Sequence, residues 1–262
     1  MVDLSLSEAE LAAERQRITR FIREQVDEAG ANGAVLGLSG GIDSSLTAAL
    51  TVEAVGADAV TGLSLPAAVS SDRHRNDAEL VADQLGLDLT VIEIEPLVSP
   101  LVEAVPHSSI GERARGNASA RLRAVLNYLI ANEEGRLVIG TGNRSEALVG
   151  YFTKYGDGAV DCHPIGGLYK CQVRQLARAL DIPERIIEKP PTAELWAGQA
   201  DEDELGLEYD QLDRILALNV DGPLSVAATA RELDCSPELV ERVRGLVSGA
   251  EHKRQMPPAP DA

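Results

Sequence analysis

The sequence contains no run of about 20 consecutive apolar residues, and this excludes a helix that crosses a membrane. Residues 1–14 carry acidic side chains and no apolar stretch, so we expect no signal peptide. Cysteine is scarce as well. Cys162, Cys171 and Cys235 form no C-x-x-C pair and no zinc-binding spacing. Such a sparse, odd set is typical of reduced thiols and predicts a cytoplasmic protein.

Positive charge is also in short supply. The 262 residues include 42 Asp and Glu but only 24 Lys and Arg, so the formal net charge is −18. Nucleic acid would repel such a chain, which disfavours a DNA- or RNA-binding role. Four of the basic residues are lysines, namely Lys154, Lys170, Lys189 and Lys253. A carboxylate-rich surface with so little lysine suggests adaptation to a salty cytoplasm; an ordinary acidic protein is the alternative.

The pattern along the chain is that of an α/β protein, with 44% hydrophobic residues. We expect strands at residues 34–38, 59–65, 88–94 and 137–140, and helices at 8–29, 44–55, 72–85 and 114–134. Short, continuously apolar strands separated by helices predict a doubly wound parallel sheet covered by helices on both faces. After residue 150 the chain is loop-rich and then helical. We therefore expect one domain at 1–255 with a helical C-terminal part, followed by a flexible tail at 256–262.

The strongest motif follows the first predicted strand, at residues 39–45 (SGGIDSS). Its glycines expose backbone N–H groups, and the following helix adds N–H donors and the positive end of its dipole. Such a loop is suited to phosphate or pyrophosphate. It matches neither the Walker A pattern nor G-x-G-x-x-G, so a dinucleotide-binding hydride-transfer fold is disfavoured. The alternative is a plain helix start with Asp43 in its first turn and Ser44 as N-cap, which explains each residue but not the set.

The S-G-G-x-D-S pattern resembles the pyrophosphate loop of the N-type ATP pyrophosphatases, which split ATP into AMP and pyrophosphate. Later stretches narrow the resemblance. They are residues 140–146 (GTGNRSE), 150–158 (GYFTKYGDG), 190–195 (PPTAEL) and 251–254 (EHKR). In this order they resemble the ammonia-dependent NAD synthetases, over nearly the whole chain. The retained lysines lie in this half of the chain, where a compact ammonium suits phosphate.

Two stretches depart from the family pattern. The family often has Asp-His after the Gly-Thr, where this chain has Gly142 and Asn143. After the second strand it often has Leu-Pro-Tyr-Gly, where residues 65–68 read LPAA. These departures leave the contacts to adenine unassigned. They lie outside the phosphate loop, so the expected phosphate chemistry is unchanged.

The resemblance implies a ligase with an adenine nucleotide alpha hydrolase-like fold. ATP would adenylate the carboxylate of deamido-NAD with loss of pyrophosphate, and ammonia would then displace AMP to give NAD. The implied substrates are ATP, deamido-NAD and ammonia, and the implied cofactor is Mg²⁺. The resemblance also implies a homodimer, with no nucleic-acid or membrane partner.

Roles for individual residues follow from matching the motifs. Those implied to bind ATP are Gly37, Leu38, Ser39, Gly40, Gly41, Ile42, Asp43, Ser44, Thr141, Lys170 and Thr192. Those implied to bind deamido-NAD are Arg121, Lys154, Asp161, His252 and Lys253. Asp43 and Glu146 would hold Mg²⁺, because hard oxygen ligands suit that ion. Asp43, Asp157 and Lys170 form the implied catalytic set, with Asp157 orienting or deprotonating ammonium. Glu146 could instead be a first-turn helix acid, and His252 a surface residue.

Two other functions stay open. Another N-type pyrophosphatase, such as a tRNA-modifying enzyme, would want a basic face and often paired cysteines. A non-catalytic nucleotide sensor would not need two metal-binding carboxylates. We expect free ammonia as nitrogen donor, because no glutaminase domain with a nucleophilic cysteine is legible in the sequence. A separate glutaminase partner remains compatible with this.

Overall fold

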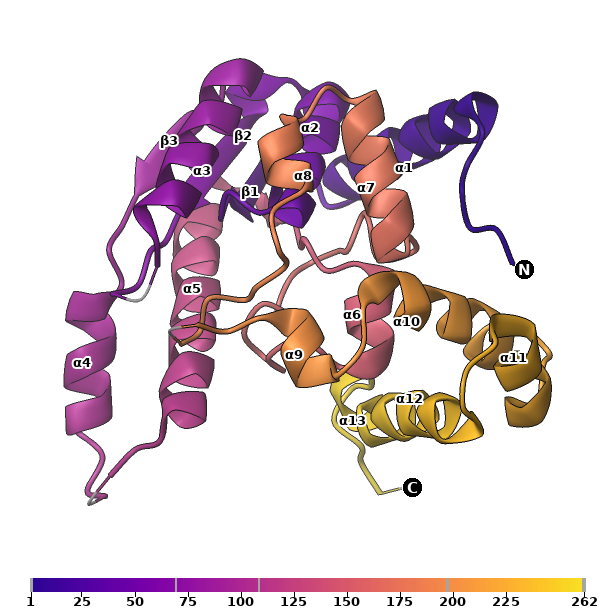
Figure 1. Cartoon of the computed structure of the whole chain (residues 1–262). Helices are drawn as coiled ribbons and strands as arrows, with labels where there is room; N and C mark the ends of the chain where they lie inside the picture. The colour runs from indigo at the N-terminus through magenta and orange to yellow at the C-terminus, as the bar shows by residue number, and fades with distance from the viewer. Residues whose placement is uncertain (1, 69, 108, 197, 261–262) are drawn as a thin grey trace.

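A parallel sheet forms the centre of the computed structural model, which describes residues 2–68, 70–107, 109–196 and 198–260 (Figure 1). The strands are β1 (Ala34–Gly37), β2 (Val60–Ser64), β3 (Asp88–Val91) and β4 (Leu137–Val138), in the order β3-β2-β1-β4. Ala34 of β1 pairs with Val60 on one side and Leu137 on the other. Neighbouring strands are therefore parallel and aligned at their starts, and their carboxyl ends lie at the same edge of the sheet. All four predicted strands are present.

Helices cover both faces of the sheet. One layer consists of α1 (Glu8–Glu28), α2 (Ile42–Val55), α3 (Asp72–Leu85), α7 (Lys170–Ala179) and α8 (Glu184–Ile187). The other consists of α4 (Glu95–Glu103) and α5 (Glu112–Glu134). Side chains along β1 alternate between them, because Ala34 and Leu36 pack in the first layer and Val35 packs in the second. This is the predicted doubly wound α/β arrangement.

The C-terminal part is helical, as expected, and has an apolar core of its own. Its elements are α6 (Arg144–Val149), α9 (Asp201–Leu205), α10 (Tyr209–Ile215), a π-helical turn (Leu216–Val220), α11 (Val226–Leu233), α12 (Pro237–Gly249) and α13 (Glu251–Arg254). Tyr209 and Leu212 of α10 and Val240 of α12 are fully buried in this core. In Figure 1 these helices lie together below α7, beside the lower end of α5. They extend the protein beyond the carboxyl edge of the sheet.

Some boundaries differ from those predicted. Helix α2 begins at Ile42 with Gly41 as N-cap, so Ser44 is not the cap; its hydroxyl bonds back to the Gly41 carbonyl. Helix α4 was not predicted, because Pro100 in its interior disguises the pattern. The predicted strand at 88–94 ends at Val91. Residues 256–260 carry no helix or strand, and 261–262 lie outside the described residues.

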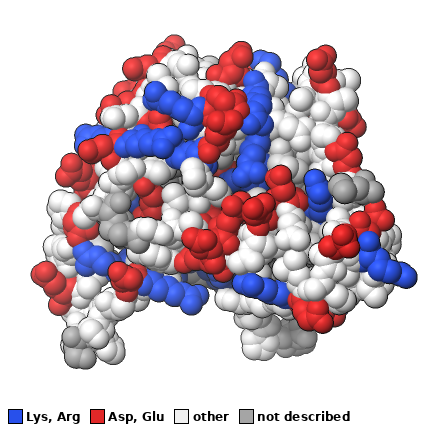
Figure 2. Space-filling model, viewed as in Figure 1, with Lys and Arg blue, Asp and Glu red and all other residues white. Residues whose placement is uncertain are grey.

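No helix among the described residues is long and apolar enough to cross a membrane. The three cysteines are unpaired. Figure 2 shows carboxylate groups spread over the visible face, with basic groups among them. The excess of negative charge is therefore not confined to one patch of that face.

Candidate active site

The topology of the sheet creates a site at its carboxyl edge. The chain steps from β1 outward to β2 and β3, and then returns to the other side of β1 as β4. Ligands of open α/β sheets bind where the strand order reverses in this way. A cavity of about 920 Å³ opens there, and its wall includes the loops that follow β1 and β4. A volume of this size is in the usual range of small-molecule sites.

The loop after β1 presents the N-terminus of α2 to the cavity. Ser39 Oγ lies 3.0 Å from Ser44 Oγ and accepts a hydrogen bond of 3.2 Å from the Gly41 N–H. Gly40 has φ +76°, and a Cβ atom there would lie 2.1 Å from the His74 carbonyl oxygen of α3. Only glycine therefore lets the loop pass so close to α3. The first N–H groups of α2 have no side-chain cap, which leaves a helix N-terminus suited to an anion.

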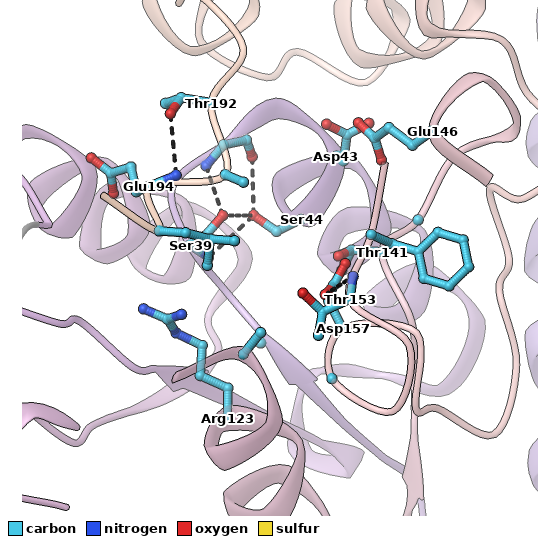
Figure 3. Close-up of a pocket in the computed structure, with 18 of the residues that line it drawn as sticks. Ser39, Asp43, Ser44, Arg123, Thr141, Glu146, Thr153, Asp157, Thr192 and Glu194 are labelled. Carbon is cyan, nitrogen blue, oxygen red and sulfur yellow. Dashed lines mark hydrogen bonds between the residues drawn. The ribbon is translucent and has the colours of Figure 1, made fainter. Parts of the chain in front are cut away.

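A buried lysine joins the two carboxylates that were expected to hold metal. Lys170 Nζ lies 2.5 Å from Asp43 Oδ2 and 3.1 Å from Glu146 Oε1, and its side chain is 3% exposed. In Figure 3 the Asp43 and Glu146 carboxyl groups lie next to each other at one end of the cavity. Asp43, which follows β1, and Glu146, which follows β4, thus both contact the Lys170 ammonium.

The electrostatics of this group follow from its burial. Burial raises the pKa of Glu146 to about 7; the Lys170 charge opposes this increase and the Asp43 charge adds to it. Burial alone would lower the pKa of Lys170, but Asp43 and Glu146 outweigh it and raise that pKa above its usual range. Lys170 is therefore a permanent cation here, whereas Glu146 can change charge near neutral pH.

Asn143 was not predicted as a functional residue. It is fully buried, and its Nδ2 donates a hydrogen bond of 2.8 Å to Asp43 Oδ1. Its Oδ1 accepts the Glu146 N–H at 3.0 Å and so caps α6. The capping preference of Asn, three residues before Glu146 and just after a strand, could have identified the cap. Nothing in the sequence indicated the contact with Asp43.

The segment rich in glycine and aromatic residues forms another wall. Asp157 Oδ1 accepts the Thr153 N–H at 2.9 Å. Although Asp157 is open to the cavity, the protein atoms around its carboxyl raise its pKa, and the Thr153 N–H and Lys253 oppose this increase. Lys253 Nζ donates to the carbonyls of Gly150 and Phe152 at 2.7 and 2.8 Å. Lys253 thereby ties α13 to this loop.

The charged residues of the cavity wall that the sequence did not reveal include Arg123 and Asp201. Arg123 of α5 donates from Nε to the Leu65 carbonyl at 2.9 Å, and its side chain points into the cavity (Figure 3). Asp201 is 4% exposed and accepts a hydrogen bond of 3.2 Å from the Tyr209 hydroxyl. Neither belongs to a motif, and only the folding of distant segments brings them to the site.

Most predicted site residues line this one cavity. They are Gly37, Leu38, Ser39, Gly41, Ile42, Asp43, Ser44, Thr141, Glu146, Asp157, Lys170, Thr192 and Lys253. Gly40 lies behind the loop against α3, where Lys189 Nζ donates to its carbonyl at 2.9 Å. The structure therefore gathers the predicted ATP and metal residues around a common space.

Four residues predicted for deamido-NAD do not line the cavity. They are Arg121, Lys154, Asp161 and His252. Arg121 Nε donates to the Lys154 carbonyl at 3.3 Å, and Lys154 Nζ donates to the His252 carbonyl. Asp161 accepts hydrogen bonds from the Tyr128 hydroxyl at 3.0 Å and from the Val138 N–H at 2.7 Å. These four residues are called the outer group below: Arg121, Lys154 and His252 contact one another, and Asp161 contacts α5 separately through Tyr128.

The donor set at the lysine fits magnesium. Mg²⁺ is usually held by one or two carboxylates together with substrate phosphates and water. Asp43 and Glu146 supply two carboxylates that already share one cation, beside a loop suited to phosphate. Among the described residues no three Asp, Glu, His or Cys side chains cluster as metal ligands. The arrangement therefore suits a metal that arrives with a phosphate ligand.

Comparison with known proteins gives matches over nearly the whole chain. The NAD synthase family model matches residues 14–257. The NH3-dependent NAD+ synthetase of Halobacterium salinarum is 56% identical over 259 residues, covering 99% of this chain and 97% of that relative. The solved structure of NMN synthetase from Francisella tularensis has a TM-score of 0.85 at 33% identity, covering 98% of this chain and 100% of that one. NH3-dependent NAD synthetase from Campylobacter jejuni has a TM-score of 0.80 at 30% identity, with coverages of 96% and 99%.

Proposed function

This chain belongs to the NAD synthase family, as its motifs predicted, and we propose that it amidates deamido-NAD with ammonia at the expense of ATP. The products are NAD, AMP and pyrophosphate. One observation carries the proposal: the phosphate loop at α2 and the group Asp43, Glu146 and Lys170 face the same cavity. That geometry supports cleavage of ATP between its α- and β-phosphates beside a bound carboxylate.

Adenylation is the first step. A carboxylate oxygen of deamido-NAD attacks the α-phosphorus of ATP, the bond to the bridging oxygen breaks, and pyrophosphate leaves. The N–H groups at the start of α2 and the hydroxyls of Ser39 and Ser44 hold the phosphates during this step. Lys170 adds a fixed positive charge where negative charge accumulates. The step needs positioning and charge stabilisation more than acid–base catalysis.

Asp43 and Glu146 are the residues proposed to hold Mg²⁺. When bound, the ion would neutralise the departing pyrophosphate. Asn143 holds Asp43 from the side opposite Lys170's ammonium contact, since the two groups bond different carboxylate oxygens. Asn143 would therefore keep Asp43 oriented whichever cation its other oxygen contacts.

Amidation is the second step. The nitrogen of ammonia attacks the carbonyl carbon of the adenylate, AMP leaves with the bonding electrons, and the nitrogen gives up a proton. Asp157 is the proposed group that orients ammonium or accepts this proton, because its carboxyl is open to the cavity and its pKa is raised above the ordinary value, which makes it a stronger base. Free ammonia as donor is supported by the relatives of matching length, which are NH3-dependent enzymes.

We propose a homodimer in which the outer group takes part in binding deamido-NAD. Val125 and Leu129 of α5 are each 60% exposed, and large apolar side chains at this exposure suit a subunit interface. Arg121, Lys154, Asp161 and His252 lie outside the cavity within one chain. A second subunit on the α5 face would let them complete its site. Sedimentation of wild type beside Val125→Glu/Leu129→Glu tests this, with a monomeric double variant as the expected result.

A cytoplasmic location and the absence of nucleic-acid and membrane partners stay predictions. The unpaired cysteines support the first. The net charge of −18 supports the absence of a nucleic-acid partner.

The purified chain with ATP, Mg²⁺, ammonium and deamido-NAD tests the function, with AMP, pyrophosphate and NAD measured together. Equal amounts of the three products are expected, and glutamine should not replace ammonium. Nicotinic acid mononucleotide serves as a competing acceptor, because one similar structure is named an NMN synthetase. A preference for the mononucleotide would contradict the dinucleotide assignment while leaving the chemistry intact. Asp43→Asn and Glu146→Gln should lower the rate about a hundredfold in the same assay.

A further inference from the structure

The N-terminus of α7 is held by side chains from other helices. Lys170 is the first residue of this helix, and its N-cap, Tyr169, offers no side-chain acceptor to the free N–H groups. The Lys170 N–H donates instead to Ser145 Oγ of α6 at 3.0 Å. The Cys171 N–H donates to Asp213 Oδ2 of α10 at 2.9 Å. Two of the N–H groups that every helix leaves unpaired at its start are therefore satisfied by α6 and α10.

One carboxylate joins all three helices. The Ser145 hydroxyl donates to Asp213 Oδ1, so each oxygen of Asp213 accepts a bond from a different helix. Ser145 and Asp213 are both fully buried. Ser145 precedes Glu146, and Cys171 follows Lys170. Asp213 thus contacts the immediate neighbours of both Glu146 and Lys170 without lining the cavity itself.

We propose that Asp213 is a positioning residue that sets the distance between Glu146 and Lys170. This inference rests on the proposed function, which gives Glu146 the metal and Lys170 the ATP phosphates. A carboxylate at a helix N-terminus is also stabilised by the helix dipole, so α7 and Asp213 fix each other. A displacement of about 1 Å at such a site can cost on the order of a hundredfold in rate.

Packing alone does not require this carboxylate. Helix α10 already packs through Leu212 and Ile215, which are fully buried in the C-terminal apolar core. A second carboxylate on the same helix, Asp210, pairs with Arg174 of α7 at 3.1 Å on the surface. The two helices are thus joined at an exposed place as well. Burying a carboxylate costs free energy unless it is well hydrogen-bonded. The hydrogen bonds of Asp213 go to Ser145 and Cys171, the neighbours of Glu146 and Lys170.

The matched variants are Asp213→Asn and Asp210→Asn. The amide at 213 keeps the size of the side chain, but it has one acceptor oxygen for two donors. We expect Asp213→Asn to lower kcat at least about tenfold and to raise KM for ATP, with KM for deamido-NAD within about twofold of wild type. Asp210→Asn should match wild type in kcat, in KM for ATP and in KM for deamido-NAD. Ser145→Ala should reproduce the selective effect, and the double variant should be no worse than the more impaired single variant.

The outcomes separate the possibilities. If Asp213→Asn raises both KM values equally and lowers Tm, or if its kcat equals that of Asp210→Asn, the positioning role is wrong. If Asp213→Asn does not fold, Ser145→Ala decides alone, and unchanged kcat and KM for ATP would overturn the role. If wild type makes no NAD, the proposed function fails. Calorimetric binding of ATP with Mg²⁺ to the variants then tests the inference without turnover, and affinity equal to wild type would overturn it.

Discussion

The Lys170 ammonium lies 2.5 Å from Asp43 Oδ2, and the two residues are 127 positions apart in the chain. The contact joins the phosphate loop to the first residue of α7. Since Glu146 Oε1 lies 3.1 Å from the same nitrogen, one buried cation contacts two carboxylates. The stability of the fold and the binding of metal are therefore linked at this point.

Lys170→Met should make stability depend on metal. Removing the ammonium leaves Asp43 and Glu146 facing each other, so the free energy of unfolding in EDTA should fall by about 2–3 kcal/mol, and Mg²⁺ should restore part of it. Lys154→Met is the control, because the described partners of Lys154 Nζ are the His252 carbonyl and the Tyr155 ring and not a carboxylate, and its loss should cost less than about 1 kcal/mol. Denaturant unfolding with and without Mg²⁺ measures both. A variant indifferent to Mg²⁺ would contradict the prediction.

Binding of Mg²⁺ should strengthen as pH rises through about 7, because burial raises the pKa of Glu146 to about 7 and only the ionised form is a good ligand. Between about pH 6 and about pH 8 the Mg²⁺ concentration for half-maximal rate should fall about tenfold. The effect on stability has the opposite sign. The folded state keeps this proton after the unfolded state has lost it, so the contribution of Glu146 to stability is present below its unfolded pKa and is lost as pH rises through about 7.

Glu146→Gln is the control for both titrations. The variant lacks the Glu146 carboxyl, so its stability should lose this part of the pH dependence, and any remaining Mg²⁺ binding should vary less with pH than it does in wild type. Persistence of the wild-type profile in Glu146→Gln would assign the titration to another group.

Gly40→Ala should damage the phosphate loop. The added Cβ would lie 2.1 Å from the His74 carbonyl oxygen at a φ of +76°, so α3 or the loop must shift. We expect a loss of at least about 3 kcal/mol of unfolding free energy and a raised KM for ATP. Gly86→Ala has a similar φ of +66°, in the left-handed region, but no atom within 4 Å, so it should cost only about 1–2 kcal/mol and leave KM unchanged. Equal effects of the two substitutions would show that backbone strain, and not the contact with α3, causes the loss of stability and the change in KM.

The two bonds of Asn143 can be separated by substitution. Asn143→Ala removes both the cap of α6 and the contact with Asp43, and should lower the unfolding free energy by about 1 kcal/mol. Asn143→Ser restores a cap but is too short to reach Asp43. Both variants should lose rate to the same extent, while only the alanine variant loses the cap energy. If Asn143→Ser keeps the full rate, the contact with Asp43 has no role in turnover.

Salt should stabilise the protein. With a net charge of −18, screening of carboxylate repulsion should raise Tm by at least about 5 °C between about 0.1 M and about 2 M KCl. The triple variant Glu24→Gln, Asp27→Asn and Glu28→Gln removes exposed acids near the C-terminal end of α1, where no basic residue offsets the helix dipole. It should melt above wild type at low salt and respond less to KCl. A wild-type Tm that does not change with salt would contradict the salt adaptation.

The local sequence carried enough information for the sheet and its helices. Strand and helix positions follow from hydrophobic periodicity, which is a property of neighbouring residues, so β1 to β4 were predicted with small errors at their ends. The phosphate loop was legible because its glycines and serines are consecutive. Where a local rule was obscured, as by Pro100 in α4, the element was missed.

The tertiary structure decided which of these residues meet. The ion pair of Lys170 with Asp43, the contact of Asn143 with Asp43 and the bond of Cys171 to Asp213 join residues that are 127, 100 and 42 positions apart. No pattern of neighbouring residues encodes such distances, because they depend on how whole helices pack and where the chain reverses around β1. Sequence therefore supplied the chemical groups of the site, and the packing of α6, α7 and α10 around the sheet edge determined their arrangement.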